Sequence, residues 1–325
     1  MREITYLQAI REALLEEMKR DERVILLGED IGKYGGAFTC TKGLFEIFGP
    51  KRVIDTPISE DGFVGAAVGA AIAGLKPVVE IMFAGFLPLC MNQIINHAAV
   101  FHYISGGQIK VPIVIRTPVC LGMGAGAQHA TSPIAWFMHV PGLKVAVPST
   151  PYDVKGLLKQ AIRCEDPVIL FEHMQLYRKW NRGFVPDEDY IIPFGQADKK
   201  REGNDITIIG ISLMVHKALE AARELAKEGI SVEVIDPRTL VPLDKETIIK
   251  SVKKTGRVVI AETDNKTCGV GAELSSIITE EAFESLEKPV KRLAAVDVPP
   301  PVSLALEKHL YPSTKDIINA IKELL

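Results

Sequence analysis

One carboxylate in this sequence stands where it could hold a ligand in a fixed place. Glu60 lies in the run Pro-Ile-Ser-Glu-Asp-Gly-Phe at 57–63, and the segment 65–74 that follows consists almost entirely of glycine and alanine. A buried acid at the mouth of a tightly packed helix can exchange protons with a bound group. Acidic residues are also favoured near helix N-termini, so Ser59, Glu60 or Asp61 could instead be a cap. Both interpretations stay open on these residues alone.

The helix predicted after Glu60 has one face without side-chain bulk. Gly65, Gly69 and Ala73 lie four residues apart, so they share a face on which another backbone can approach closely. The apolar run is too short and too rich in glycine to span a bilayer. We therefore expect tight packing inside the protein or across a subunit interface.

A glycine-rich loop at 122–126 ends in a histidine, His129. The spacing is not that of a dinucleotide fingerprint, because Ala127 stands in place of the last glycine and no acid follows about twenty positions on. A Walker-type ending is also absent. A flexible loop with a histidine suits proton transfer near neutral pH, and a surface or capping histidine is the alternative.

Apolar residues at 82–87, Met-Phe-Ala-Gly-Phe-Leu, directly follow a predicted strand. Such residues usually belong to the core. The carboxyl edge of a parallel sheet is also where ligands bind, and flat apolar side chains there can bracket an aromatic ring.

The other reactive side chains give weaker signals. His97 and His102 are five residues apart and share no helix face, so a metal site is not expected. No cysteine pair is spaced as C-x-x-C, which argues for reduced thiols and a cytoplasmic protein. The first residues contain no signal-peptide core. A net charge of −3 gives no reason to expect a nucleic-acid partner.

The elements that must position these residues alternate between strands and helices, which indicates parallel α/β sheets. Predicted strands are 24–27, 53–54, 78–82, 111–116, 143–147, 167–171, 206–211, 231–235, 257–261 and 290–294, and predicted helices are 4–20, 63–75, 87–103, 151–163, 215–228, 245–255, 272–283 and 314–325. The stretch 177–204 is charged and turn-rich. We expect an N-terminal domain over 1–190, a linker over 191–204 and a C-terminal domain over 205–325.

Taken together and in order, the motifs resemble those of one family, the beta subunits of the thiamine-diphosphate-dependent 2-oxo acid dehydrogenases. The matching segments span the chain: Leu-Gly-Glu-Asp at 27–30, Asp-Thr-Pro-Ile-Ser-Glu-Asp-Gly-Phe at 55–63, Ser-Gly-Gly at 105–107, Val-Pro-Ile-Val-Ile-Arg at 111–116, Pro-Gly-Leu-Lys-Val at 141–145, Pro-Ser-Thr-Pro-Tyr-Asp at 148–153, Asp-Pro-Arg-Thr-Leu-Val-Pro-Leu-Asp at 236–244 and Gly-Val-Gly-Ala-Glu at 269–273. The resemblance implies a pyrimidine-binding domain followed by a transketolase-like C-terminal domain.

The resemblance also implies roles for single residues. Glu60 would hydrogen-bond the aminopyrimidine ring of thiamine diphosphate and promote its activation. Phe86 would stack on that ring, with Met82 on the same wall. His129 would assist transfer of the acyl group to a lipoyl arm, and Glu29 would belong to a polar tunnel between paired active sites.

A potassium site built mainly of backbone carbonyls is a further implication, at Ile113, Ala161, Cys164 and Asp166. The sequence departs from the family in two places near the tunnel, because Leu89 and Asn92 stand where some members have acids. A complete acidic path between active sites is therefore in doubt.

The Gly-Asp-Gly motif with which thiamine enzymes hold magnesium and the diphosphate is missing from this chain. The resemblance therefore implies an alpha subunit that supplies Mg²⁺, an α2β2 heterotetramer, and a lipoyl acyltransferase core as a further partner. The implied reaction is cleavage of a 2-oxo acid of the pyruvate type, or of acetoin, followed by reductive acylation of the lipoyl group. Alternatives are a branched-chain 2-oxo acid dehydrogenase, half of a split transketolase or deoxyxylulose-phosphate synthase, and a non-catalytic structural subunit.

Overall fold

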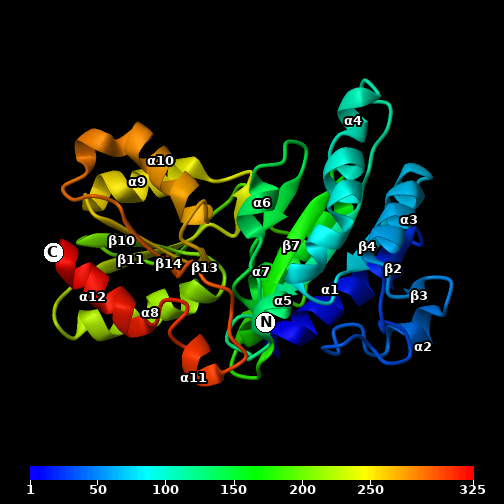
Figure 1. Ribbon diagram of the computed structural model, residues 1–325, viewed down its shortest axis with the longest axis horizontal. Coiled ribbons are helices and arrows are strands. Elements are labelled where there is room, and N and C mark those ends of the chain that lie inside the picture. The colour runs from blue at the N-terminus through cyan, green and yellow to red at the C-terminus, as the bar shows by residue number, and fades with distance from the viewer.

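The computed structural model describes residues 1–325, in which two helix-covered sheets lie side by side (Figure 1). The first sheet has the order β12-β6-β7-β5-β4-β2-β3. Its strands are β2 (Val24–Gly28), β3 (Val53–Asp55), β4 (Lys76–Glu80), β5 (Val114–Val119), β6 (Lys144–Ala146), β7 (Val168–His173) and β12 (Thr239–Val241). All neighbours are parallel except β12 and β6, so the C-terminal half of the chain contributes one antiparallel edge strand to the N-terminal sheet.

The second sheet has the order β14-β13-β10-β11-β9. Its strands are β9 (Asp198–Arg201), β10 (Ile206–Gly210), β11 (Val232–Asp236), β13 (Val258–Asn265) and β14 (Lys291–Ala295). Only β9 is antiparallel to its neighbour. A separate two-stranded ribbon pairs β1 (Arg2–Thr5) with β8 (Arg182–Val185). Parallel sheets flanked by helices confirm the predicted fold class.

Helices cover both faces of each sheet (Figure 1). The helices of the N-terminal half are α1 (Tyr6–Arg20), α2 (Leu44–Phe48), α3 (Glu60–Ile72), α4 (Phe101–Ile104), α5 (Gly126–His129), α6 (Ile134–Met138) and α7 (Pro151–Arg163), with the irregular turns η1 (Ala84–Cys90), η2 (Gln93–Ala98) and η3 (Met174–Tyr177). Those of the C-terminal half are α8 (Leu213–Ala226), α9 (Lys245–Thr255), α10 (Val270–Ala282), η4 (Phe283–Ser285), α11 (Leu304–Glu307) and α12 (Thr314–Leu324).

The hydrophobic core forms two layers, one on each face of the sheets. Along β2, Ile25 and Leu27 face one layer, while Val24 and Leu26 face the other, as the two-residue period of a strand requires. Each layer contains residues of both domains, so burying these strands fixes the domains against each other.

Local sequence signals explain where two of the main helices begin. Thr5 caps α1 in a capping box with Gln8. Thr150 caps α7, and Pro151 occupies the first helical position, where its missing N–H costs nothing.

The single helix predicted over 87–103 is wrong. The segment is broken into η1, a π-helical turn η2 and the short α4, and α4 lies at the tip of an arm that projects from the N-terminal domain (Figure 1). Pro88 lies inside η1, and proline cannot donate the backbone hydrogen bond of a regular helix. No helix in the chain has the length and apolar character required to cross a membrane.

Candidate functional site

Four neighbouring strands end at the same edge of the first sheet, and each is followed by one of the predicted site residues. Glu29 follows β2, Glu60 begins the helix after β3, Phe86 lies in η1 after β4, and His129 lies in α5 after β5. In the sheet these strands lie in the order β5-β4-β2-β3. The carboxyl edge of a parallel sheet is the usual position of a ligand site, so the fold brings these four residues to one place.

Glu60 is the first residue of α3 and is only 6% exposed, yet its carboxylate makes no hydrogen bond within the chain. Ser59 occupies the cap position without forming a side-chain cap bond. The neighbouring Asp61 accepts a hydrogen bond from Gln93 Nε2 at 3.1 Å. The helix-cap alternative therefore fails for Ser59 and Glu60, and a largely buried carboxylate is left without a partner in the chain, so it can accept a hydrogen bond from a ligand.

Glu29 lies close enough to Glu60 for the two charges to interact. Burial raises the pKa of the Glu29 carboxyl, and the nearby charges of Glu60 and Asp30 raise it further. Its Oε1 atom is buried without a hydrogen-bond partner. Two neighbouring carboxyls, of which one resists ionisation, can share a proton.

Aromatic rings form the wall beside these acids. The Phe83 and Phe86 ring centroids are 5.3 Å apart, and the His129 imidazole lies 4.7 Å from Phe83 and 5.3 Å from Phe86. Met82, Phe83 and Phe86 are only partly buried, so this wall has an open side. Phe83, which the sequence did not single out, is the ring that contacts both Phe86 and His129.

The turn η1 packs against both α3 and α5, which brings the Glu60 helix, the aromatic wall and His129 together. Gly85 permits this contact, because a Cβ atom there would lie 2.3 Å from the Gln128 carbonyl oxygen. The His129 ring is half-buried, and its nitrogens make no hydrogen bond within the chain. They are therefore free to exchange a proton with a ligand.

The glycine loop before His129 is held in place, contrary to the flexible loop that we expected from its sequence. Gly122 N and Gly124 N donate hydrogen bonds of 2.8 and 2.7 Å to the two carboxylate oxygens of Glu307. Backbone N–H groups that could have cradled a phosphate thus bind a carboxylate of the same chain, which supports rejection of the nucleotide interpretations.

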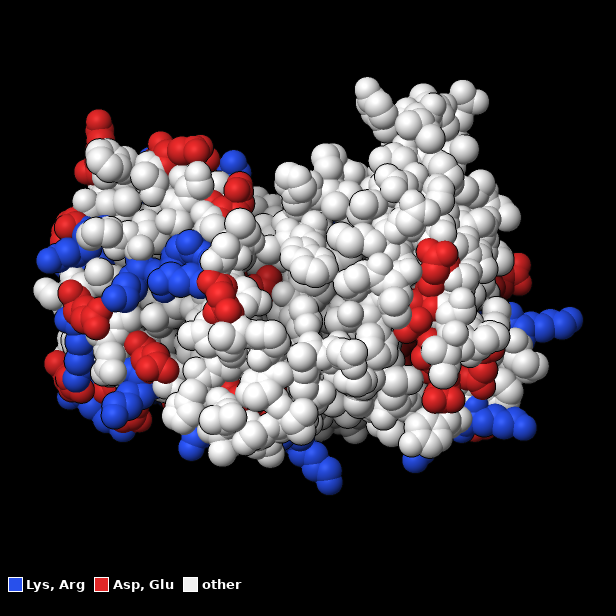
Figure 2. All heavy atoms as spheres, in the orientation of Figure 1, with Lys and Arg blue, Asp and Glu red and all other residues white.

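The bulk-free face of α3 packs only in part within the chain. A Cβ atom at Gly65 would touch the Gln93 side chain at 3.3 Å, whereas one at Gly69 would meet nothing within 4 Å. Ala73 and Ile72 are exposed, the latter by 41%. Figure 2 shows acidic side chains gathered in the region of β2 and β3, while no Lys, Arg, Asp or Glu is visible on this face of the projecting arm around α4. Leu89, at the base of that arm, is 60% exposed, and Asn92 accepts a hydrogen bond from Asn96.

The four positions of the implied potassium site lie at the opposite edge of the sheet from Glu60. Ile113 precedes β5, and Cys164 and Asp166 lie between α7 and β7. The Ile113 and Ala161 carbonyls already accept backbone hydrogen bonds, from Val168 N and Cys164 N. The Asp166 carboxylate pairs with Lys144 at 2.6 Å. At this edge an ion would act on the fold and not on the reacting atoms.

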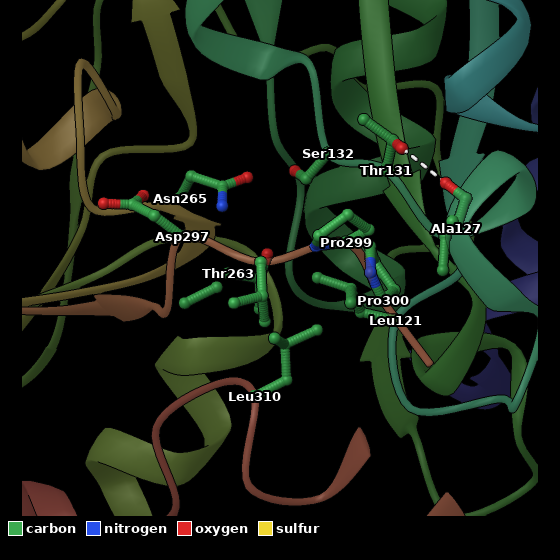
Figure 3. Close-up of a pocket in the computed structure, with 13 residues that line it drawn as sticks. Leu121, Ala127, Thr131, Ser132, Thr263, Asn265, Asp297, Pro299, Pro300 and Leu310 are labelled. Atoms are coloured by element: carbon green, nitrogen blue, oxygen red, sulfur yellow. Dashed lines mark hydrogen bonds between the residues drawn. The ribbon is translucent and has the colours of Figure 1, made fainter. Parts of the chain in front are cut away.

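A pocket of about 490 Å³ opens next to His129, between the two domains (Figure 3). Thr131 and Ser132 line it from the N-terminal side, and Asn265, Asp297 and Pro299 line it from the C-terminal side. Glu60, Phe86 and His129 do not line it, but Ala130, the residue after the histidine, does. The pocket therefore borders the loop that carries His129 and not the carboxylate.

Two groups of buried charges escaped the sequence analysis. Arg116 on β5 donates two hydrogen bonds to Glu172, at 2.9 and 2.7 Å, and a short one to Glu80. On β13, burial raises the pKa of Glu262 to about 8 and that of Asp264 to about 7. Arg116, Glu80 and Glu172 come from three different strands, and Asp264 binds residues more than 120 positions away, so periodicity does not reveal these contacts.

Comparison with known families matches both halves of the chain. Residues 2–179 match the family described as "Transketolase, pyrimidine binding domain", and residues 195–317 match "Transketolase, C-terminal domain". Among solved structures, one described as "Split gene transketolase, inactive beta4 tetramer" superimposes with a TM-score of 0.80 at 27% identity, over 99% of this chain and 98% of the other.

Characterised relatives match over nearly their whole length. The chain is 46% identical to the 2-oxoisovalerate dehydrogenase subunit beta of Bacillus subtilis, over 99% of this chain and 98% of the relative. It is 48% identical to the pyruvate dehydrogenase E1 component subunit beta of Rickettsia felis, with the same two shares. It is 43% identical to the acetoin:2,6-dichlorophenolindophenol oxidoreductase subunit beta of Bacillus subtilis, over 100% of this chain and 98% of the relative.

Proposed function

This chain belongs to the family of E1 beta subunits of the thiamine-dependent 2-oxo acid and acetoin dehydrogenases, and we propose that it forms half of a thiamine diphosphate site with an alpha subunit. The assembled enzyme would cleave a 2-oxo acid of the pyruvate type, or acetoin, and pass the acyl group to a lipoyl arm. The observation that carries this proposal is the buried carboxylate of Glu60, which lacks a partner within the chain.

The residues present suit the aminopyrimidine half of the cofactor. Glu60 can share a hydrogen bond with a ring nitrogen, and the partly buried Met82 and Phe86 can cover the flat face of the ring. When bound, the cofactor supplies the carbon nucleophile that attacks the oxo group. Glu60 then fixes the ring and holds or releases the proton at that nitrogen.

The Glu29 carboxyl can exchange a proton with Glu60. Because burial and the Glu60 charge raise the pKa of Glu29, it can keep a proton that Glu60 gives up. Leu89 and Asn92 cannot extend this path as acids would, so we place the exchange between Glu29 and Glu60 and not along a continuous acidic tunnel.

His129 would act at the later step. Its free imidazole lies against Phe83 and Phe86 and can deliver a proton to the lipoyl sulfur as the acyl group is transferred. The inter-domain pocket of Figure 3 gives a reactant room to approach from that side.

We assign the Mg²⁺ and the diphosphate group to the alpha subunit. The open part of the α3 face, with Gly69, Ile72 and Ala73, is a surface on which a second backbone can pack closely. We further propose an α2β2 assembly, docking of the acyltransferase core on the C-terminal domain, and a boundary between the domains within 191–204. A potassium ion near Ile113, Ala161, Cys164 and Asp166 would stabilise the turn between α7 and β7.

The test is to measure turnover of the purified chain with and without its alpha subunit, in the presence of thiamine diphosphate and Mg²⁺. Pyruvate, branched-chain 2-oxo acids and acetoin are offered separately. We expect cleavage of at least one of them by the pair and none by either chain alone. Full turnover by this chain alone, or ketol transfer between sugar phosphates with no cleavage of 2-oxo acids or acetoin, would overturn the proposal.

A further inference from the structure

The loop that carries His129 is held at both ends by carboxylates of the C-terminal domain. At its start, Glu307 of α11 accepts the Gly122 and Gly124 N–H groups. After the histidine, Asp264 at the end of β13 accepts a short hydrogen bond from Ser132 Oγ and a second from Ala135 N at 3.1 Å. These contacts join residues between 129 and 185 positions apart in the sequence.

The start of the loop is shaped to receive its anchor. Gly122 and Gly124 have φ values of +81° and +68°, which disfavour any other residue. A Cβ atom at Gly124 would lie 3.0 Å from the Val302 carbonyl oxygen, in the segment that leads to α11. Glycine therefore lets this segment come close enough for Glu307, whose side chain is fully buried, to span two N–H groups.

Neither anchor has a basic partner. Asp264 is 3% exposed and Glu307 is 0% exposed, and no lysine, arginine or histidine nitrogen lies within 4 Å of either carboxylate. The hydrogen bonds to the loop are thus their only protein contacts that offset burial of a carboxylate. Removing one partner of such a buried hydrogen bond leaves the other buried and unsatisfied.

The loop between the anchors borders open space. Ala127, Thr131 and Ser132 line the inter-domain pocket, whose opposite wall comes from the C-terminal domain (Figure 3). Without anchors the loop could relax into this volume of about 490 Å³. His129 would then leave the Phe83 and Phe86 rings.

We propose that Asp264 and Glu307 are positioning residues for the acyl-transfer step, which hold His129 against the aromatic wall from the second domain. This inference rests on the role proposed above for His129. It gives the C-terminal domain a part in the reaction itself, in addition to any part in assembly.

The test compares Asp264→Ala, Asp264→Asn and Glu307→Gln in the assembled α–β enzyme. At position 264, asparagine keeps one acceptor oxygen for the loop, whereas alanine keeps none. At position 307, glutamine keeps one acceptor oxygen but turns its NH₂ group toward the other backbone N–H of the loop. The control is Glu233→Gln, since Glu233 is a fully buried carboxylate on β11 that accepts hydrogen bonds from Ser251 and Lys254 and does not touch the loop.

Three readouts are measured: reductive acylation of a lipoyl domain, decarboxylation with an artificial electron acceptor, and amide hydrogen exchange. We expect Asp264→Ala and Glu307→Gln to lower the kcat of acylation about tenfold or more, because small displacements of a reacting group are costly. Decarboxylation and the KM for the lipoyl domain should change less. Exchange should accelerate in 120–135 alone, and Asp264→Asn should recover part of the acylation rate.

Two results would overturn the inference. One is unchanged acylation in both anchor variants while His129→Ala abolishes it. The other is equal loss of both reactions with faster exchange throughout the chain, which would mark a general structural role. If His129→Ala itself leaves acylation intact, the proposed function of His129 fails. Faster amide exchange confined to 120–135 in the Asp264 and Glu307 variants would then still establish that these residues hold the loop.

Discussion

Phe83 and His129 meet in a T-shaped contact, with ring centroids 4.7 Å apart and ring planes at 82°. They follow different strands of the sheet, and Gly85 allows the two turns that carry them to touch. The contact links the aromatic wall, which we assign to cofactor binding, to the histidine, which we assign to acyl transfer. A change at Gly85 should therefore disturb both functions at once.

Gly85→Ala should displace η1 from α5, because the added Cβ would lie 2.3 Å from the Gln128 carbonyl oxygen. Overpacking of this kind costs about 1–3 kcal/mol. We expect a lower thermal midpoint and weaker cofactor binding, measured by differential scanning calorimetry and by titration of the assembled enzyme. The same change at Gly69, where a Cβ meets nothing within 4 Å, is the control for folding.

Gly69→Ala should separate folding from assembly. In an exposed helix, alanine is more favourable than glycine by about 1 kcal/mol, so the isolated chain should unfold at the same temperature or higher. The added methyl group should nevertheless weaken binding of the alpha subunit if α3 packs closely against it. Analytical ultracentrifugation measures that affinity. The control Ser276→Ala, on the exposed side of α10, should leave the affinity for the alpha subunit unchanged. If the parent chain and both variants bind the alpha subunit equally well, α3 does not lie in the interface.

His129→Ala should uncouple the two half-reactions. Decarboxylation with an artificial electron acceptor should persist, while acylation of a lipoyl domain should fall about 10²-fold, within the range that a positioned acid or base contributes. Rapid-quench measurement of the two steps distinguishes them. Parallel loss of both would place His129 in the cofactor site itself.

The contribution of Glu262 and Asp264 to the stability of the chain should fall as pH rises from about 4 to about 8. Burial raises the folded-state pKa of Glu262 to about 8 and that of Asp264 to about 7, so the folded state binds more protons than the unfolded state across this interval. Their contribution is complete below their ordinary pKa values and is lost as pH passes through the raised ones.

Glu262→Gln removes one of these charges and keeps an acceptor for the N–H of Gly271. At pH 9 the variant should be more stable than the parent chain by something on the order of 2 kcal/mol, and at pH 5 the difference should shrink toward zero. Urea unfolding at both values measures it. The exposed Glu284→Gln is the control, and a pH-independent difference would show that Glu262 ionises normally.

The sequence predicted the parts of the fold that local pattern determines. The apolar run at Val24–Leu27 predicted β2, and the small-residue segment after Glu60 predicted a helix with Glu60 at its beginning. Strands β8 and β9 were missed because neither of these four-residue segments alternates between apolar and polar residues. Their pairing rests on backbone hydrogen bonds.

The site was predicted less completely than the fold. Phe83 was missed because core and ligand-facing aromatic residues look alike in sequence. Glu307 and Asp264 were missed because each reaches its partners across more than 120 residues, and no periodic pattern records such a contact.

The most direct measurement is thiamine-dependent turnover of the assembled enzyme carrying Glu60→Gln, at saturating thiamine diphosphate and Mg²⁺. Asp61→Asn is the matched control, because Asp61 is the adjacent acid of the same helix but is exposed. We predict a loss of about 10²-fold or more for Glu60→Gln, the scale of general acid–base catalysis, with normal assembly, and little change for Asp61→Asn. Undiminished turnover by the Glu60→Gln enzyme would contradict the assignment of Glu60 to the cofactor.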